Sequence, residues 1–323
     1  MKSIYIERFG DNSVLQIGQR PRPRVKRGQV LVKVKAASVN PRDWIVREGK
    51  YVFQKALPAF PVILGSDISG EVVAVGAGAS KFTIGQSVFG MQPLRGGMGA
   101  FAEYVAIDQS ALALKPDNVS HIDAAAVPCA GLTAWQGISK ISNVSSDQRV
   151  TICGASGGVG SYALQLAKAR GAHVTAVCGP KHVEVIQNLG ADQVINYKET
   201  HYTKVVSHQD LVFDAVGRDN FRRAKKSLNS KGRYLTTIPS AASALNTVTS
   251  NTKRMLSLGH GKSSHLVLVR PLGNALMEIA NLMEQGKVKS LIDSVFPIED
   301  TASALAKSRS WHASGKIVLD VSQ

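Results

Sequence analysis

The chain has 323 residues, of which 44% are hydrophobic, and its formal net charge is +16. This length exceeds what one hydrophobic core usually supports, so we expect two domains. The composition is that of a globular protein and excludes a low-complexity, collagen-like or solenoid chain. The longest uncharged stretch, between Asp123 and Lys140, is too short to span a bilayer, which predicts no membrane span. No secretory leader pattern is present, so an intracellular protein is expected.

The cysteines indicate the same compartment. The chain has only three of them, Cys129, Cys153 and Cys178, and no CxxC pair. An odd number without close spacing argues against a disulfide framework. Free buried thiols are the simpler interpretation, and they predict a reducing compartment such as the cytoplasm.

The positive charge raises the question of nucleic-acid binding. Basic clusters occur at 20–27 (RPRPRVKR) and 222–226 (RRAKK). Prolines interrupt the first cluster, and neither is interleaved with aromatic residues that would stack on bases. A solvated basic surface that helps to attract an anionic cofactor or substrate is therefore favoured over a nucleic-acid interface.

The first part of the chain, up to about residue 120, is predicted to be rich in β-strands. Short β-branched runs such as Val30–Val34 and Gly70–Gly76 are separated by glycine and proline.

From Arg149 onward, apolar strands alternate with helical segments. The predicted strands are 149–153, 173–178, 193–196, 210–214, 233–238 and 265–269, and the predicted helices are 159–169, 181–189 and 218–229. This alternation favours a doubly wound parallel sheet with helices on its faces, an α/β fold of the Rossmann type. Gly171 and Gly190 stand where left-handed residues would end the first two helices.

After about residue 272, one helix is expected, followed by short β-like runs up to Val321. The simplest organisation is a Rossmann domain at 123–272 inserted into a β-rich domain made of 1–122 and 273–323. Ligands of such sheets lie outside the carboxyl ends of the strands.

The most specific motif is GASGGVG at 154–160, which follows the apolar strand ending at Cys153. The pattern G-x-G-x-x-G maps onto Ala155, Gly157 and Gly160, with alanine in the first position. These positions allow a tight turn, close approach of a pyrophosphate and close helix–sheet packing, and the helix N-terminus favours the anion. The residues expected to contact a dinucleotide here are Ala155, Ser156, Gly157, Gly158, Val159 and Gly160.

The end of the second strand indicates which dinucleotide binds. NAD enzymes usually place a carboxylate there, but this chain has Gly179 and Lys181, with no carboxylate before Glu184. A glycine leaves room and a lysine offers positive charge, which suits a 2′-phosphate. Tyr197, after the third strand, would donate a further hydrogen bond. NADPH is therefore preferred over NADH.

With these motifs in place, the chain resembles the medium-chain dehydrogenase/reductase superfamily over nearly its full length. Within that superfamily it is similar to the quinone oxidoreductase branch, which includes zeta-crystallin and the chloroplast-envelope quinone oxidoreductase homologues. The resemblance rests on segments 38–44 (SVNPRDW), 65–72 (GSDISGEV), 131–134 (GLTA), 154–160, 189–192 (LGAD), 286–289 (GKVK) and 312–318 (HASGKIV). It implies that the first domain is a GroES-like catalytic domain.

The departures from the zinc alcohol dehydrogenases of this superfamily are informative. Those enzymes carry a metal-binding cysteine near the position of Asn40 and Gly-His-Glu where this chain has Gly65-Ser66-Asp67. The four-cysteine lobe is also missing, since 85–105 contains no cysteine. No metal site is therefore predicted. Without a Lewis acid to stabilise an alkoxide, reduction of quinones or α,β-unsaturated carbonyl compounds is favoured over alcohol oxidation.

The resemblance also implies roles for single residues. Thr133 would lie on the nicotinamide side and Gly217 near the adenosine half. Asn40 and Asp43 would shape the floor of the active site, or would bond only local backbone in a turn. Tyr51 stands where related enoyl-thioester reductases have a proton-donating tyrosine.

Two alternative functions stay open at this point. One is an enoyl-thioester reductase, and the other is a non-catalytic protein that binds NADPH or RNA. A homodimer is expected from the family alone.

Overall fold

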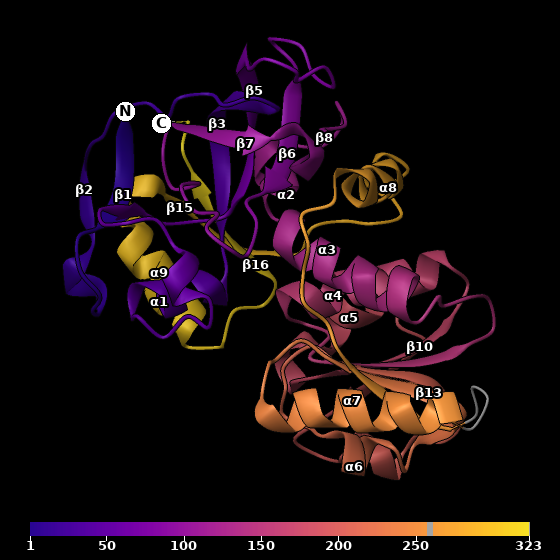
Figure 1. Ribbon diagram of the computed structural model, residues 1–323. Coiled ribbons are helices and arrows are strands. Elements are labelled where there is room, and N and C mark those ends of the chain that lie inside the picture. The colour runs from indigo at the N-terminus through magenta and orange to yellow at the C-terminus, as the bar shows by residue number, and fades with distance from the viewer. Residues whose placement is uncertain (257–260, 323) are drawn as a thin grey trace. The chain divides into compact units, whose positions relative to one another are not determined.

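The computed structural model describes residues 1–256 and 261–322 (Figure 1). The chain forms two compact units, one made of 1–132 and 270–323 and the other of 133–269. The second unit is therefore an insertion in the first. In the described residues, no helix is both long and apolar enough to cross a membrane.

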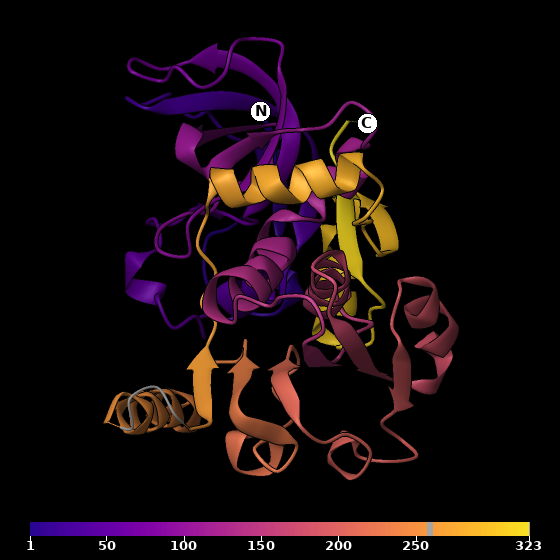
Figure 2. The ribbon, with the colours of Figure 1, turned by 90° about the vertical axis from the view of Figure 1, so that its right-hand side faces the viewer.

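The inserted unit contains a six-stranded sheet in which every neighbouring pair is parallel (Figure 2). In sheet order the strands are β11 (Gln193–Asn196), β10 (His173–Cys178), β9 (Arg149–Cys153), β12 (Gln209–Asp214), β13 (Leu228–Thr236) and β14 (Ser263–Leu266). The connecting helices are α4 (Gly158–Ala169), α5 (Val183–Asn188), α6 (Phe221–Ala224) and α7 (Ala241–Leu256). This arrangement confirms the predicted Rossmann-type sheet.

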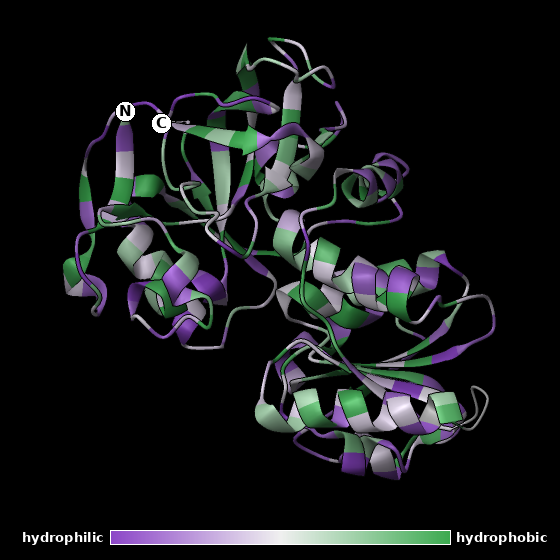
Figure 3. Cartoon of the chain, viewed as in Figure 1, coloured by the Kyte–Doolittle hydropathy of each residue, from purple (hydrophilic) through white to green (hydrophobic). Residues whose placement is uncertain are grey.

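The apolar runs in the sequence of these strands match their burial in the sheet. In β9 the four residues after Arg149 are buried, and in β10 the five after His173 are buried. Strands covered on both faces contain continuous apolar runs rather than alternating ones, and these runs are visible as green strands in Figure 3. Gly171 and Gly190 have φ angles of +80° and +98°, so the predicted left-handed helix ends are confirmed.

Several predicted elements were wrong. The helix predicted at 218–229 is only the single turn of α6, because β13 already begins at Leu228. The strand predicted at 265–269 begins earlier, at Ser263. Helix α7 was not predicted, since its Ser, Thr and Asn residues obscure the apolar period. Leu245, Val248 and Met255 on this helix are 65%, 64% and 73% exposed.

The other unit is built mainly of antiparallel strands. A seven-stranded sheet has the order β15–β16–β3–β5–β6–β8, with β7 paired to β3, and a second sheet has the order β2–β1–β4. The strands of the larger sheet are β3 (Gln29–Val39), β5 (Asp67–Val75), β6 (Ser87–Met91), β7 (Tyr104–Asp108), β8 (Leu112–Leu114), β15 (Ile292–Pro297) and β16 (Lys316–Asp320). Those of the smaller sheet are β1 (Lys2–Ile6), β2 (Gln16–Gln19) and β4 (Val62–Ile63).

Helices of this unit are α1 (Pro41–Arg47), α2 (His121–Ala125), α8 (Gly273–Glu284) and α9 (Thr301–Arg309), while α3 (Pro128–Trp135) crosses the unit boundary. Helix α9 was not predicted. The boundary lies at 132, ten residues later than the expected 122. The reason is that α2 packs on the larger sheet, where Ala125 and Ala126 share a buried cluster with Ala36 of β3 and Val318 of β16.

We expect Gly160→Ala to destabilise the inserted unit by roughly 2 kcal/mol, because overpacking against fixed backbone typically has this effect. A Cβ at residue 160 would lie 2.1 Å from the carbonyl oxygen of Gly154. Urea unfolding followed by circular dichroism would measure the change. Gly157→Ala is the matched control, since its Cβ would lie 3.4 Å from the same oxygen. Equal stability of the two variants would contradict the packing argument.

Candidate functional site

The loop at 154–160 joins the carboxyl end of β9 to the start of α4. Gly154 has a φ of +76°. The N–H groups of Gly154 and Ala155 both donate to the carbonyl of Val177, at 3.0 Å, which ties the loop to the neighbouring strand β10. Gly157 is the N-cap of α4 and has extended backbone geometry. The loop is therefore held by backbone contacts that glycine and alanine permit.

The six predicted cofactor contacts in this loop differ in burial. Ala155 and Gly160 are buried, whereas the four residues between them are partly exposed. The first-turn N–H groups of a helix have no intrahelical acceptors and carry partial positive charge. An anionic group that approaches Gly157 and Gly158 would meet these donors without a side chain in its way.

Gly179, Lys181 and Tyr197 lie at the same edge of the sheet as the glycine loop, because they follow the carboxyl ends of the parallel strands β10 and β11. A Cβ on Gly179 would be 3.5 Å from the ring of Tyr197, so these two residues are neighbours. Lys181 is exposed in a 3-10 turn, and the Tyr197 side chain is 53% exposed. Both side chains can reach a ligand from solvent.

Gly217 belongs to a loop that Asp214 holds in place, and this role of Asp214 was not predicted. The Asp214 carboxylate accepts hydrogen bonds from the N–H groups of Val216, Gly217 and Asp219, at 2.8–3.1 Å. It also accepts one from the hydroxyl of Tyr234, at 2.9 Å. Gly217 itself has a φ of +68°. A carboxylate at the end of an apolar strand, before a glycine, is the signal that indicates such a brace.

Thr133, the remaining predicted cofactor residue, lies on α3 and is 6% exposed.

In the other unit, Asn40 belongs to a buried polar cluster. Its Nδ2 donates to Asp67 Oδ2 at 3.0 Å, and its Oδ1 accepts from Lys316 Nζ at 2.6 Å. The same Asp67 oxygen accepts from Ser38 Oγ and from the backbone N–H of Cys129, both at 3.1 Å. Lys316 also donates to the carbonyl of Val39, at 2.9 Å. Both ends of the Asn40 amide are thus engaged by the protein.

Asp43 forms a capping box with Asn40 at the start of α1. Its Oδ2 accepts from the backbone N–H of Asn40 at 2.8 Å, which agrees with the turn role considered from the sequence. Among the described residues, Asp43 Oδ1 has no hydrogen-bond partner. Complete burial raises the pKa of Asp43 to about 7. This carboxyl therefore keeps its proton to a much higher pH than an exposed aspartate does.

Tyr51 is the most accessible of the three predicted catalytic residues. Its hydroxyl donates to the carbonyl of Leu94 at 2.8 Å. The guanidinium of Arg42 lies 5.2 Å from the centre of its ring and donates to the carbonyls of Leu94 and Gly97. Burial raises the pKa of Tyr51, so the phenol keeps its proton at neutral pH.

The structure brings Asn40, Asp43 and Tyr51 into one unit, and Asp43 contributes to the raised pKa of Tyr51. Sequence reasoning missed Ser38 and Lys316 as parts of the cluster and treated Asp67 only as a missing metal ligand. Burial raises the pKa of the Cys129 thiol to about 12, which keeps it protonated and unreactive. Within the described residues, no three His, Cys, Asp or Glu side chains gather so that they could hold a metal ion.

Comparisons with known proteins agree with this geometry. Residues 26–117 match the family model of the alcohol dehydrogenase GroES-like domain, and residues 189–319 match the model named zinc-binding dehydrogenase. The chain is 33% identical to the chloroplast envelope quinone oxidoreductase homolog of Arabidopsis thaliana, over 99% of this chain and 98% of that one. It is also 33% identical to the mitochondrial NAD(P)H oxidoreductase RTN4IP1 of Mus musculus, over 99% and 89%.

Among solved structures, the quinone oxidoreductase from Coxiella burnetii superposes with a TM-score of 0.87 and 30% identity, over 99% of both chains.

We expect Asp43→Asn to change how stability depends on pH. The carboxyl has a pKa of about 7 when folded and an ordinary value of 3.8. The folded state therefore binds its proton more tightly, and wild-type stability falls as pH rises from about 4 to 7, by at most ~1.4 kcal/mol per pH unit from this group. The variant lacks this contribution, so its free energy of unfolding relative to wild type should rise over that window.

Urea unfolding at several pH values from 4 to 8 would measure this difference. Asp108→Asn is the control, because Asp108 is an exposed carboxylate that also caps a 3-10 turn. Curves for Asp43→Asn and wild type that stay parallel from pH 4 to 7 would rule out proton retention by Asp43.

Proposed function

Because the chain belongs to the medium-chain dehydrogenase/reductase superfamily, in its quinone oxidoreductase branch, we propose that it is a zinc-independent reductase that transfers a hydride from NADPH to quinones or α,β-unsaturated carbonyl compounds. Relatives named quinone oxidoreductases and NAD(P)H oxidoreductases establish the class of enzyme as an oxidoreductase. The cofactor form, the substrate class and the absence of zinc are the proposal.

The observation that supports zinc independence best is the position of Lys316. Lys316 is 4% exposed and its ammonium group is hydrogen-bonded to Asn40; burial raises the pKa of the Asp67 carboxyl, and the Lys316 charge partly offsets this. A fixed cation there repels a metal ion, and the three donors on Asp67 Oδ2 already use that oxygen. Hydride transfer to a quinone or an enone needs less activation by a Lewis acid than a reaction that forms an alkoxide.

The inserted unit fits a dinucleotide. A Cβ at Gly157 would lie 3.4 Å from the Gly154 carbonyl oxygen, and the nearest atoms to one at Gly179 would be those of the Tyr197 side chain, at ordinary contact distance. The first-turn N–H groups of α4 would hold the pyrophosphate. Lys181 and Tyr197 would bind the 2′-phosphate. When bound, NADPH supplies the hydride.

The residues of the other unit would manage the proton. Tyr51 keeps its proton on the phenolic oxygen, and this hydroxyl donates to the Leu94 carbonyl, which a substrate oxyanion can replace. The Asn40 amide donates to Asp67 and accepts from Lys316. We infer that Asn40 and Asp43 position the start of α1, which carries Arg42 against Tyr51.

The test of function is cofactor oxidation at 340 nm with 1,2-naphthoquinone, 9,10-phenanthrenequinone, a 2-alkenal, an enone and crotonyl-CoA, with and without a chelator. Chelator-insensitive turnover of a quinone or enone with NADPH is expected. Turnover of crotonyl-CoA alone would instead identify an enoyl-thioester reductase. RNA binding that weakens steeply with salt, without any turnover, would favour the non-catalytic alternative.

We expect Tyr51→Phe to lower kcat for an enone at least tenfold and for a quinone less than threefold. An enolate needs a proton from a positioned donor, whereas a hydroquinone anion is a weaker base that water can protonate. Steady-state kinetics with both substrates would measure the split. Tyr5→Phe, on strand β1 of the smaller sheet, is the control for loss of a hydroxyl. Equal losses with both substrates would contradict proton donation by Tyr51.

We expect Lys181→Ala to raise the KM for NADPH about tenfold and the KM for NADH less than twofold, since only NADPH carries the 2′-phosphate. Lys168→Gln is the control, because Lys168 lies at the opposite end of α4 from the glycine loop, paired with Asp192 at 2.8 Å. If both cofactors weaken by the same factor, Lys181 does not recognise the phosphate.

The substrate would be the main partner of the protein. A homodimer is also part of the proposal, supported by the exposed apolar side chains of Leu245, Val248 and Met255, and sedimentation would test it.

The cytoplasm is the proposed compartment on the basis of the three free cysteines. The names of the relatives place those proteins in chloroplasts and mitochondria, so a fluorescent fusion would be the deciding observation.

A further inference from the structure

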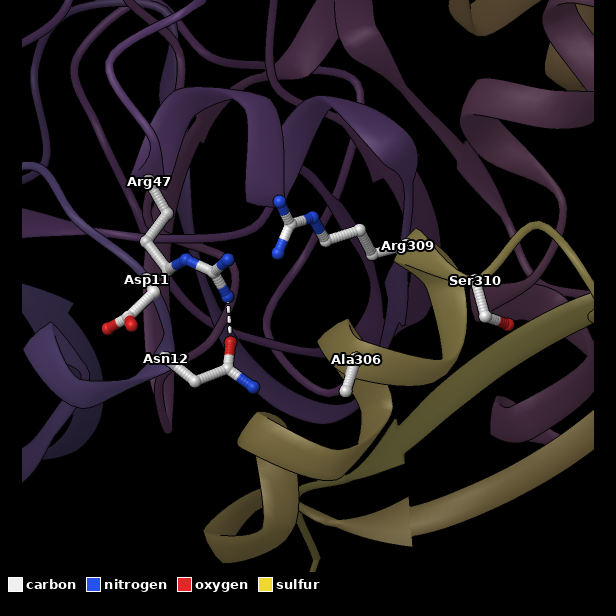
Figure 4. A pocket seen from close by; sticks show the side chains of 6 residues that line it. All are labelled: Asp11, Asn12, Arg47, Ala306, Arg309 and Ser310. Carbon is white, nitrogen blue, oxygen red and sulfur yellow. Dashed lines mark hydrogen bonds between the residues drawn. The ribbon is translucent and has the colours of Figure 1, made fainter.

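A pocket of about 380 Å³ lies where the carboxyl-terminal ends of α1 and α9 meet (Figure 4). In Figure 4 the guanidinium groups of Arg47 and Arg309 extend toward each other from these two helices. The lining residues are Asp11, Asn12, Arg47, Ala306, Arg309 and Ser310. All of them belong to the same unit, so this pocket is complete without the inserted domain.

The charges around the pocket leave an excess of positive charge. Glu48 Oε1 pairs with Arg47 Nη2 at 3.3 Å and with Arg309 Nε at 3.0 Å, while its Oε2 pairs with Lys50 Nζ at 2.9 Å. One carboxylate thus faces three cations. Asp11 is the other carboxylate; its Oδ1 accepts from the N–H and hydroxyl of Ser13, at 2.9 and 2.6 Å, and its charge acts on Arg47, so three cations outnumber two carboxylates by one. In Figure 4 the Asp11 carboxylate points away from Arg309.

The two arginines differ in a way that suits ligand binding. The Arg47 side chain is 2% exposed and is fixed by the Gly10 carbonyl, Asn12 Oδ1 and Glu48. Arg309 is 53% exposed, and it turns only Nε to Glu48. In the part of the chain that the structure describes, its two Nη groups have no hydrogen-bond acceptor. All three Arg47 nitrogens already donate within the protein, so Arg47 supplies a fixed positive charge, and the open donors for an oxyanion are those of Arg309.

Helix carboxyl-terminal ends disfavour anions when their carbonyls are free. Here the carbonyls nearest to the pocket are used. The Arg47 carbonyl accepts from the N–H of Gly10 at 3.0 Å, and the Ala306 carbonyl accepts from the N–H of Ser310 at 3.1 Å. The Lys307 carbonyl accepts from the N–H and the hydroxyl of Ser310. The exposed arginine charge therefore dominates the pocket.

We propose that this pocket is a binding site for a small organic phosphate, held between Arg47 and Arg309. A phosphate group accepts hydrogen bonds from a guanidinium pair more strongly than a carboxylate of single charge. The volume is at the lower end of the range of ligand pockets, which suits a phosphate with a short organic group rather than a nucleotide. This site is independent of the reductase function.

The test is titration of the full-length protein with glycerol 3-phosphate, inorganic phosphate and acetate at constant ionic strength, followed by calorimetry and tryptophan fluorescence. Trp311 follows α9 and its ring lies 6.1 Å from that of Trp44 on α1, so fluorescence reports on this end of both helices. We expect saturable binding, at least threefold tighter for glycerol 3-phosphate than for phosphate, and weakest for acetate. Absence of saturation would overturn the proposal.

Variants separate this site from other basic surfaces. Arg309→Gln should raise the Kd for glycerol 3-phosphate at least tenfold. Lys307→Gln is the matched control, because it removes the same charge from the same helix but from a residue paired with Asp293 at 2.5 Å, and its Kd should change less than twofold. Equal weakening by both variants would mean general screening. Binding lost in Lys181→Ala but kept in Arg309→Gln would place the phosphate at the dinucleotide loop. Either result would overturn the proposal.

Discussion

The ammonium group of Lys316 is the constraint on which the catalytic unit depends. A lysine that is 4% exposed must find acceptors, since an unpaired buried charge is strongly destabilising. It finds them in the Val39 carbonyl and the Asn40 amide. Strand β16 can satisfy this lysine only when it is paired with β3 in the observed register, with Ile317 opposite Val39. The same contact places the N-cap of α1, and with it the positions of Arg42 and Asp43.

The inserted unit also holds its loops in fixed positions, but it does so with a different kind of contact. In the dinucleotide site proposed for this unit, backbone N–H groups would bind the pyrophosphate, and side chains such as Asp214 brace the loops. Asp214 holds the Gly217 loop through three N–H groups and receives a fourth hydrogen bond from Tyr234. A site made of backbone donors has a fixed geometry before the ligand arrives, so little reorganisation is needed on binding.

The difference between these two constructions explains what could be predicted from the sequence. The loop at 154–160 was predictable because its glycines, strand and helix are adjacent in the chain. The partnership of Asn40 with Lys316 was not, because 276 residues separate them and no local pattern marks a lysine for burial. Strand β13 was mistaken for helix over 228–229, since its first residues, Leu228 to Gly232, include polar and basic side chains that lack the period of a buried strand. Pairing with β12 overrides this local preference.

The pairing of β3 with β16 has a consequence for synthesis on the ribosome. Asn40 leaves the ribosome long before Lys316, and at roughly 5–20 residues per second the interval is tens of seconds. The inserted unit receives its last strand, β14, late in that interval but still before β16 is made, and until then β3 exposes the edge that β16 later covers. Unpaired strand edges invite contact with other chains. The nascent protein therefore exposes this edge of β3 for most of its synthesis, until β16 pairs with it.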